Sequence, residues 1–293
     1  MLFATKLGSV GRSGGRMLAV SVGVGSALVL FLPEPRAEAQ SQEPARNCPR
    51  EMLGFANYCI DRYEIHTVDN KTGQTLSPFY PPEPKLLRVA YSFWAFEAGR
   101  ESSDRASLVE LPPVPAIEHG EFEPRAVSAA GILPQGYLTY YTASAACTRA
   151  GKRLCSEPEW TRACRSDRGT KHPYGDTFEP NRCNVFRALH PAFELHGNSS
   201  VGHLDPRLHL VLEEGKAPLL LPTAAKTSCA SRHQGEALYD MVGNLDEWIQ
   251  DPNGTFVGGF YARSTREGCE AKIENHGPAY TDYSLGTRCC KDR

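Results

Sequence analysis

The chain has 293 residues, and its 32 lysines and arginines nearly balance its 34 aspartates and glutamates, giving a formal net charge of -2. A nearly neutral chain lacks the broad basic surface of most nucleic-acid-binding proteins, so no nucleic-acid partner is expected. Only one long apolar run is present, which excludes a protein that crosses a membrane several times. The 41% of hydrophobic residues is enough to bury a sizeable core.

The N-terminus has the order of a secretory signal peptide. Basic residues precede an apolar run at 17–32, and the small-residue triplet AEA ends at Ala39. We therefore expect a signal peptide at 1–39, cleavage after Ala39, and a secreted or periplasmic protein. The apolar run is shorter than the roughly 20 residues that a helix needs to cross a bilayer, so no stable membrane span is expected after cleavage. An uncleaved anchor is the alternative.

Ten cysteines follow this segment. In an oxidising compartment they are expected to form up to five disulfides. The C-x-x-C spacing typical of zinc ribbons and thioredoxins is absent from the sequence. Cys48 and Cys59 flank the first predicted strand, and a local bridge between them is expected.

The mature chain is predicted to be a flexible linker at 40–50 followed by one domain at 51–293. A hairpin is expected over 52–65. Surface insertions are expected near 97–124 and 186–236.

Between these regions, residues 69–84 are rich in turn-forming residues and are predicted to be a loop. Residues 86–96 are predicted to form a strand.

Two helices are predicted from periodicity and capping residues. A cap at Thr139 or Thr142 precedes apolar residues at helical spacing from 143 to 150, and Gly151 ends the helix. The second helix opens with a capping box at 156–159. Residues 166–236 show little periodicity, and short strands are expected again around 256–261 and 285–289.

Six motifs occur in one order along the chain: AGKRLCSEPEWTRAC at 150–164, YGD at 174–176, CN at 183–184, YDMVGNLDEW at 239–248, GG at 258–259 and GTRCC at 286–290. This series resembles the formylglycine-generating enzyme family, also called the sulfatase-modifying factor domain. The stretch YCIDRYEI at 58–65 also resembles the first conserved strand of that family. The resemblance covers roughly 52–293.

The resemblance implies an α+β fold, a loop-rich variant of the C-type lectin fold with two short helices, short antiparallel sheets and disulfide staples. It also implies bridges between Cys147 and Cys289 and between Cys164 and Cys269. The remaining cysteines are Cys155, Cys183, Cys229 and Cys290. They can pair in three ways, of which Cys183–Cys229 with Cys155–Cys290 is favoured.

The enzymes of the family oxidise a cysteine of a sulfatase with copper and oxygen. Copper(I) prefers soft thiolates, and the resemblance places the two ligand cysteines shortly after the GG motif. Residues 260–268 contain no cysteine, Phe260 replaces a serine of the family, and Asp246 replaces a tryptophan. Catalysis and a copper cofactor are therefore not expected. An iron cofactor is not expected either, because the resemblance places the iron-binding histidines of the family's sulfoxide synthases in a separate helical domain that this sequence does not show.

Calcium is the cofactor that the resemblance favours, as a structural ion. Asp240 and Glu247 match side-chain ligands, and Gly243 and Leu245 match carbonyl ligands, which are the hard oxygen donors that calcium prefers. An acidic turn held by hydrogen bonds alone is the alternative. Asn184 and Val185 match half of a second calcium site.

Two other groups of residues are candidate ligands. Four histidines recur at spacings that are wide for a metal site, and a polar loop is the favoured interpretation; they are His190, His196, His203 and His209. Arg263, Arg266 and Arg288 are expected to be solvated surface residues rather than an anion-binding groove.

Three functions are consistent with the sequence. The favoured one is a secreted, non-catalytic, calcium-stabilised scaffold that binds a protein, peptide or glycan. The second is a metal-dependent oxidoreductase of this family, using copper or non-haem iron to act on a cysteine or small thiol. The third is a structural envelope protein.

Overall fold

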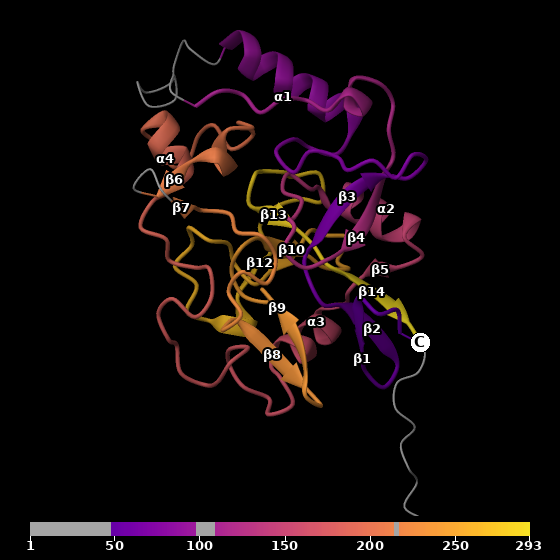
Figure 1. Cartoon of the computed structure of the whole chain (residues 1–293). Helices are drawn as coiled ribbons and strands as arrows, with labels where there is room; N and C mark the ends of the chain where they lie inside the picture. The colour runs from indigo at the N-terminus through magenta and orange to yellow at the C-terminus, as the bar shows by residue number, and fades with distance from the viewer. Residues whose placement is uncertain (1–47, 98–108, 214–216) are drawn as a thin grey trace, which may run out of the picture. The chain divides into compact units, whose positions relative to one another are not determined.

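The computed structural model describes residues 48–97, 109–213 and 217–293 (Figure 1). The predicted signal peptide with its cleavage site, most of the predicted linker and part of the insertion expected near 97–124 lie outside the described residues. Within the described ranges, no helix combines the length and the apolar character needed to cross a bilayer.

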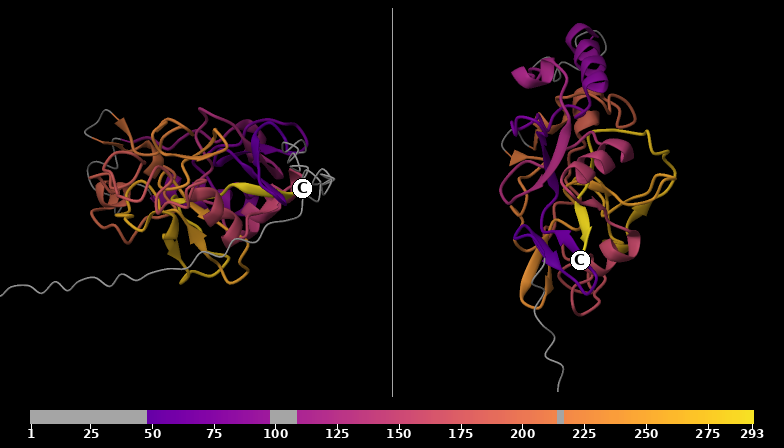
Figure 2. Two further views of the ribbon diagram at one scale, coloured as in Figure 1. Left: turned by 90° about the horizontal axis from the view of Figure 1, so that it is seen from below. Right: turned by 90° about the vertical axis from the view of Figure 1, so that its right-hand side faces the viewer.

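The described part of the chain is a mixed α+β domain. Its α-helices are α1 (Pro84–Glu97), α2 (Tyr140–Arg149), α3 (Glu157–Cys164) and α4 (Pro191–His196). Short 3-10 helices occur at Ala116–His119, Leu208–Leu210 and Gly268–Glu270. Helix α1 lies at the opposite end of this domain from the C-terminus (Figures 1 and 2).

Two four-stranded sheets form the framework. The first has the order β1 (Met52–Gly54), β2 (Tyr58–Asp61), β14 (Cys289–Asp292) and β5 (Arg153–Leu154). The second has the order β12 (Lys272–Ile273), β11 (Phe256–Val257), β10 (Asp246–Trp248) and β13 (Leu285–Gly286). Of the pairs in these sheets, β10 with β13 is parallel and the others are antiparallel.

Three antiparallel strand pairs complete the described structure. They are β3 (Ile65–Asp69) with β4 (Pro124–Ser128), β6 (Leu212–Glu213) with β7 (Ala217–Pro218), and β8 (Ala230–His233) with β9 (Glu236–Tyr239). The predicted fold class, α+β with short antiparallel sheets, is confirmed. The predicted first hairpin corresponds to β1 and β2.

The two predicted helices are present as α2 and α3, and their predicted caps are formed. Thr139 and Thr142 make a reciprocal capping box at the start of α2. Ser156 and Glu159 make the same arrangement at the start of α3. Both signals lie within a few residues of chain, which is why the sequence alone reveals them.

The strand predicted at 86–96 is wrong, because this segment lies within α1. The Glu83 carboxylate accepts the N–H groups of Lys85 and Leu86 at 3.2 and 2.7 Å and so caps the helix. Leu87 and Ala90, three residues apart, are buried. The helix is therefore marked by a capping residue and by a short buried face. Packing of that face stabilises the helix even though the aromatic residues of the segment have low helix propensity.

The aperiodic region predicted at 166–236 contains more regular structure than expected. It holds α4, the β6–β7 pair and β8. Two of the four described α-helices, α1 and α4, were thus not predicted. Helix α4 has only six residues, which is too short for a periodic pattern to be recognised.

All ten cysteines of the chain are paired in five disulfides. The pairs are Cys48–Cys59, Cys147–Cys289, Cys155–Cys290, Cys164–Cys269 and Cys183–Cys229. Both the pairs implied by the resemblance and the favoured pairing of the remaining cysteines are confirmed. All except the first lie in the hydrophobic core clusters.

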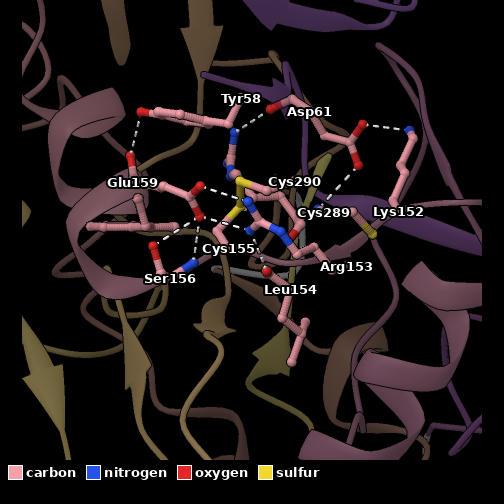
Figure 3. Close-up of a disulfide and its surroundings, with 12 residues drawn as sticks. Tyr58, Asp61, Lys152, Arg153, Leu154, Cys155, Ser156, Glu159, Cys289 and Cys290 are labelled. Atoms are coloured by element: carbon pink, nitrogen blue, oxygen red, sulfur yellow. Dashed lines mark hydrogen bonds and ion pairs between the residues drawn. A yellow bond between two sulfur atoms is a disulfide. The ribbon is translucent and has the colours of Figure 1, made fainter. Parts of the chain in front are cut away.

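The Cys155–Cys290 bridge joins the start of α3 to the C-terminal strand (Figure 3). Beside it, both terminal nitrogens of Arg153 donate to the Glu159 carboxylate at 2.7 and 2.8 Å. On the other side, Lys152 lies 2.6 Å from buried Asp61. This cluster fixes β5, α3 and β14 relative to one another.

Candidate functional site

A buried ion pair between Glu247 and Arg288 lies beside the acidic turn predicted to bind calcium. Strands β10 and β13 pair with Glu247 opposite Gly286, which brings Arg288 close to Glu247. The Arg288 guanidinium donates to both carboxylate oxygens at 2.7–2.9 Å, and the Trp160 indole N–H donates at 2.6 Å. Glu247 and Arg288 are each 1% exposed. The pair is therefore shielded from water.

Two further buried carboxyl groups, of Glu64 and Asp240, interact electrostatically with this pair. Glu64 accepts the backbone N–H of Leu245 at 2.9 Å. Burial, reinforced by repulsion from Asp240 and Glu247, raises the pKa of Glu64 well above its usual range. Burial also raises the pKa of Asp240 to about 6. Three carboxyl groups thus face one guanidinium, that of Arg288, and charge balance favours a proton or a cation here.

The structure brings the two predicted groups of calcium ligands together. The Asn184 carbonyl accepts the Asn244 N–H at 3.0 Å. A Cβ added to Gly243, whose φ is +85°, would lie 2.4 Å from the Asn184 carbonyl oxygen and 2.7 Å from a methyl group of Val185. Only glycine fits this approach. The side-chain oxygen of Asn184 accepts an N–H of Arg187 at 3.3 Å, which places a positive charge beside that predicted ligand.

The donor set fits calcium in part. One oxygen of Asp240 accepts the Ala224 N–H at 2.6 Å, whereas both oxygens of Glu247 are engaged in the ion pair. In the part of the chain that the structure describes, no three His, Cys, Asp or Glu side chains form a group that could hold a metal ion. Calcium at this turn would therefore take most of its ligands from backbone carbonyls, such as those predicted at Gly243 and Leu245.

A second region of interest is the segment 260–268, where the resemblance places copper-binding thiolates. It contains no cysteine, and the next cysteine, Cys269, is bonded to Cys164. Phe260 and Tyr261 are buried instead, and both pack against Tyr283 with ring centroids 5.7 and 6.2 Å apart. The segment therefore offers buried aromatic side chains and no thiol.

Asp246 is fully buried in β10 and forms an ion pair with Arg263 across this segment. Two N–O contacts of 2.8 Å join the groups, and Asp246 also accepts the Gly259 N–H at 3.0 Å. Burial raises the pKa of Asp246 to about 7, with Arg263 opposing and Asp282 reinforcing the shift. Arg263 also lies over the Phe260 ring at 5.3 Å. One arginine thus contacts both residues that depart from the family pattern.

Three of the four histidines surround an aromatic ring. The rings of His190, His203 and His209 lie 6.3, 6.2 and 5.8 Å from that of Tyr283, whereas His196 lies 3.0 Å from an oxygen of Asp205. Burial lowers the pKa of His209 to about 3 and also lowers that of His190. The three rings are thus packed around a tyrosine.

The expectation that three arginines are surface residues is wrong for Arg288, which is buried, while Arg263 is partly buried and ion-paired. Sequence reasoning also missed Glu64, whose signal was its place in the family's first conserved strand. The burial of Glu64 and the role of Arg288 as a buried counterion cannot be seen in the local sequence, because both residues approach Glu247 only when distant strands assemble.

A family model described as sulfatase-modifying factor enzyme 1-like domain matches residues 34–293. Inactive C-alpha-formylglycine-generating enzyme 2 of Bos taurus is 29% identical over 168 residues, which are 55% of this chain and 40% of that protein. Formylglycine-generating enzyme of Bos taurus is 23% identical over 243 residues, which are 80% of this chain and 58% of that protein. The matches therefore span less than two thirds of these relatives.

Solved structures give a weaker similarity. The crystal structure of CarF has a TM-score of 0.40 and 12% identity, covering 80% of this chain and 86% of CarF. PvdO from Pseudomonas aeruginosa has a TM-score of 0.38 and 14% identity, covering 80% of each chain. Similarity at this level identifies no function.

Proposed function

The chain belongs to the sulfatase-modifying factor enzyme 1-like domain family, and from that premise we propose that it is a secreted or periplasmic, non-catalytic member that binds a protein, peptide or glycan. One observation carries the proposal: every cysteine of the chain is in a disulfide. The copper chemistry of the resembled enzymes needs a pair of thiolates, and this chain has no thiol to supply them.

Two further observations support the non-catalytic part of the proposal. Arg263 pairs with Asp246 and lies over the Phe260 ring, so one arginine holds both residues that depart from the family pattern. Two of the curated relatives carry the name inactive C-alpha-formylglycine-generating enzyme 2. The disulfide-rich fold is compatible with a secretory or lumenal location.

We expect no oxidase activity from the purified protein with its disulfides intact. It would be incubated with copper(I), oxygen and a cysteine-containing sulfatase peptide, and aldehyde formation followed by mass spectrometry. The formylglycine-generating enzyme of Streptomyces coelicolor serves as the positive control. Copper retained at one ion per chain, together with product above the protein-free rate, would show that the chain is an oxidoreductase and overturn the proposal.

Calcium is proposed as the structural ion of the 240–247 turn, because Arg288 is already paired with Glu247 and the buried carboxyl group of Asp240 has no cationic side chain of the described ranges in contact with it. At a calcium concentration about 100 times Kd, binding adds about 2.7 kcal/mol, which should raise the Tm by about 5–10 °C. Asp240→Asn keeps the side-chain shape but lowers the negative charge, so the calcium concentration needed for half the shift should rise at least tenfold. The measurement is thermal unfolding across a calcium titration.

Glu121→Gln provides the control for this experiment, because the Glu121 side chain is 80% exposed and pairs with Arg88 on the surface. Its calcium response should match that of the unmodified chain. A Tm that does not change between calcium and chelator would exclude calcium binding at the turn.

A further inference from the structure

A surface cavity of about 540 Å³ lies outside both regions described above. Its walls come from the chain after α3, the loop at 173–182 and the start of β8. Helix α3 and β8 contact each other, and both are labelled in Figure 1. The volume is within the roughly 300–1,000 Å³ range of small-ligand sites.

Three arginines line this cavity, and they differ in how far their positive charges are paired within the protein. Arg182 pairs with Glu179 at 3.0 Å and lies 5.1 Å from the Tyr174 ring. Arg168 donates to the Tyr174 carbonyl at 3.2 Å, which leaves its positive charge unbalanced. The exposed Arg232 side chain makes no hydrogen bond or ion pair with any residue in the described ranges. Two guanidinium groups are thus available to a ligand.

One carboxylate, that of Asp167, also lines the cavity, but it is already engaged. It accepts the Gln234 N–H and faces the His233 ring nitrogen at 3.2 Å. These contacts lower the pKa of Asp167, the backbone hydrogen bond contributing most. The Asp167 charge is therefore partly satisfied within the protein, and the cavity retains an excess of positive charge.

Guanidinium groups match the planar, two-oxygen geometry of carboxylate and the oxygens of sulfate. A single inorganic anion would fill only a small part of this volume. A larger molecule that carries an anionic group fits the cavity better. Exposed Thr227 supplies a hydroxyl group beside the arginines, and the Ser228 hydroxyl, which donates to the Arg182 carbonyl at 2.7 Å, can still accept a hydrogen bond. These two hydroxyl groups suit the hydroxyl groups of a saccharide.

We propose that this cavity binds an acidic saccharide, with Arg168 and Arg232 contacting its carboxylate or sulfate group. The inference rests on the proposed binding function, for which it names the ligand class.

Isothermal titration calorimetry at about physiological salt tests the proposal with the full domain. The acidic probes are a hyaluronate tetrasaccharide, which carries carboxylates only, and a chondroitin sulfate tetrasaccharide, which adds sulfates. Neutral cellotetraose and inorganic sulfate are the controls. At least one acidic tetrasaccharide should bind at one per chain, and at least tenfold more tightly than either control.

Arg168→Ala and Arg232→Ala should each weaken that binding at least tenfold, because each removes a direct contact. Arg232→Lys keeps the positive charge but loses the two-pronged geometry of the guanidinium group. Its affinity should therefore lie between that of the unmodified chain and that of Arg232→Ala. Arg50→Ala removes an equal charge from an exposed arginine outside the cavity and should change affinity less than twofold. Unchanged thermal unfolding confirms that the variants are folded.

No binding of either acidic tetrasaccharide would overturn the inference, as would an equal loss with Arg50→Ala, which indicates unspecific charge attraction. Inorganic sulfate binding as tightly as the tetrasaccharides would also overturn it, since the saccharide would then contribute nothing. None of these binding results bears on the proposal that the chain is non-catalytic. That proposal is tested separately by the assay with copper and a cysteine peptide, and oxidation of the peptide would overturn it whether or not a saccharide binds.

Discussion

Arg288→Met is expected to lower the free energy of unfolding by about 3–5 kcal/mol, because Glu247 would remain buried without its counterion. The Arg288 guanidinium also donates to the backbone carbonyls of Asp61 and Tyr239 at 3.2 and 2.8 Å, and these would lose a donor. Methionine has a similar volume but donates no hydrogen bonds. Unfolding in guanidinium chloride at pH 7, with disulfides intact and calcium chelated, measures the loss.

Arg88→Met is the matched control on the surface, where Arg88 and Glu121 are 48% and 80% exposed. Exposed pairs contribute at most about 1 kcal/mol. Combining Arg288→Met with Glu247→Gln should restore part of the lost stability, because the unpaired charge is then removed. Equal losses for Arg288→Met and Arg88→Met would show that Arg288 is not the counterion of the buried carboxyl groups.

Loss of both disulfides that anchor the C-terminal strand should destabilise the protein far more than either loss alone. Cys147–Cys289 and Cys155–Cys290 have sequence separations of 142 and 135 residues and close almost the same loop. While one bridge remains, the other closes only a ring of about ten residues, worth about 2.7 kcal/mol in the chain-entropy model. Because Cys164–Cys269 still joins the two segments, removing both bridges opens a larger ring of roughly 30 residues and costs about 6.5 kcal/mol in total.

This result would be measured by denaturant unfolding of the two Cys→Ala pair variants and of their combination. A loss of about 6.5 kcal/mol is comparable with the total stability of a typical domain, about 5–15 kcal/mol, so the combined variant should be largely unfolded or close to it. Cys48–Cys59 closes a separate loop with a separation of 11 residues. The loss in free energy of unfolding on its removal should therefore add to the loss from removing either of the other two bridges. A combined loss equal to the sum of the two single losses would contradict the shared-loop account.

The sequence by itself determined the features that depend on neighbouring residues. The capping boxes of α2 and α3 lie within four residues of chain, so their signals were readable before any packing was known. The family motifs implied the α+β fold and two of the five disulfides, Cys147–Cys289 and Cys164–Cys269. The absence of cysteine from 260–268 was also plain in the sequence, and the structure added that every cysteine elsewhere is in a disulfide.

Tertiary structure alone decided the features that depend on distant segments. Burial of Leu87 and Ala90 makes α1 a helix where local residues suggested a strand. Arg288 is a buried counterion because β10 and β13 pair in parallel, and no local pattern reveals that partner. The arginine-lined cavity likewise joins segments that are separate in sequence. Local hydrogen bonding can be read from a few residues, whereas burial and charge pairing depend on which distant surfaces meet.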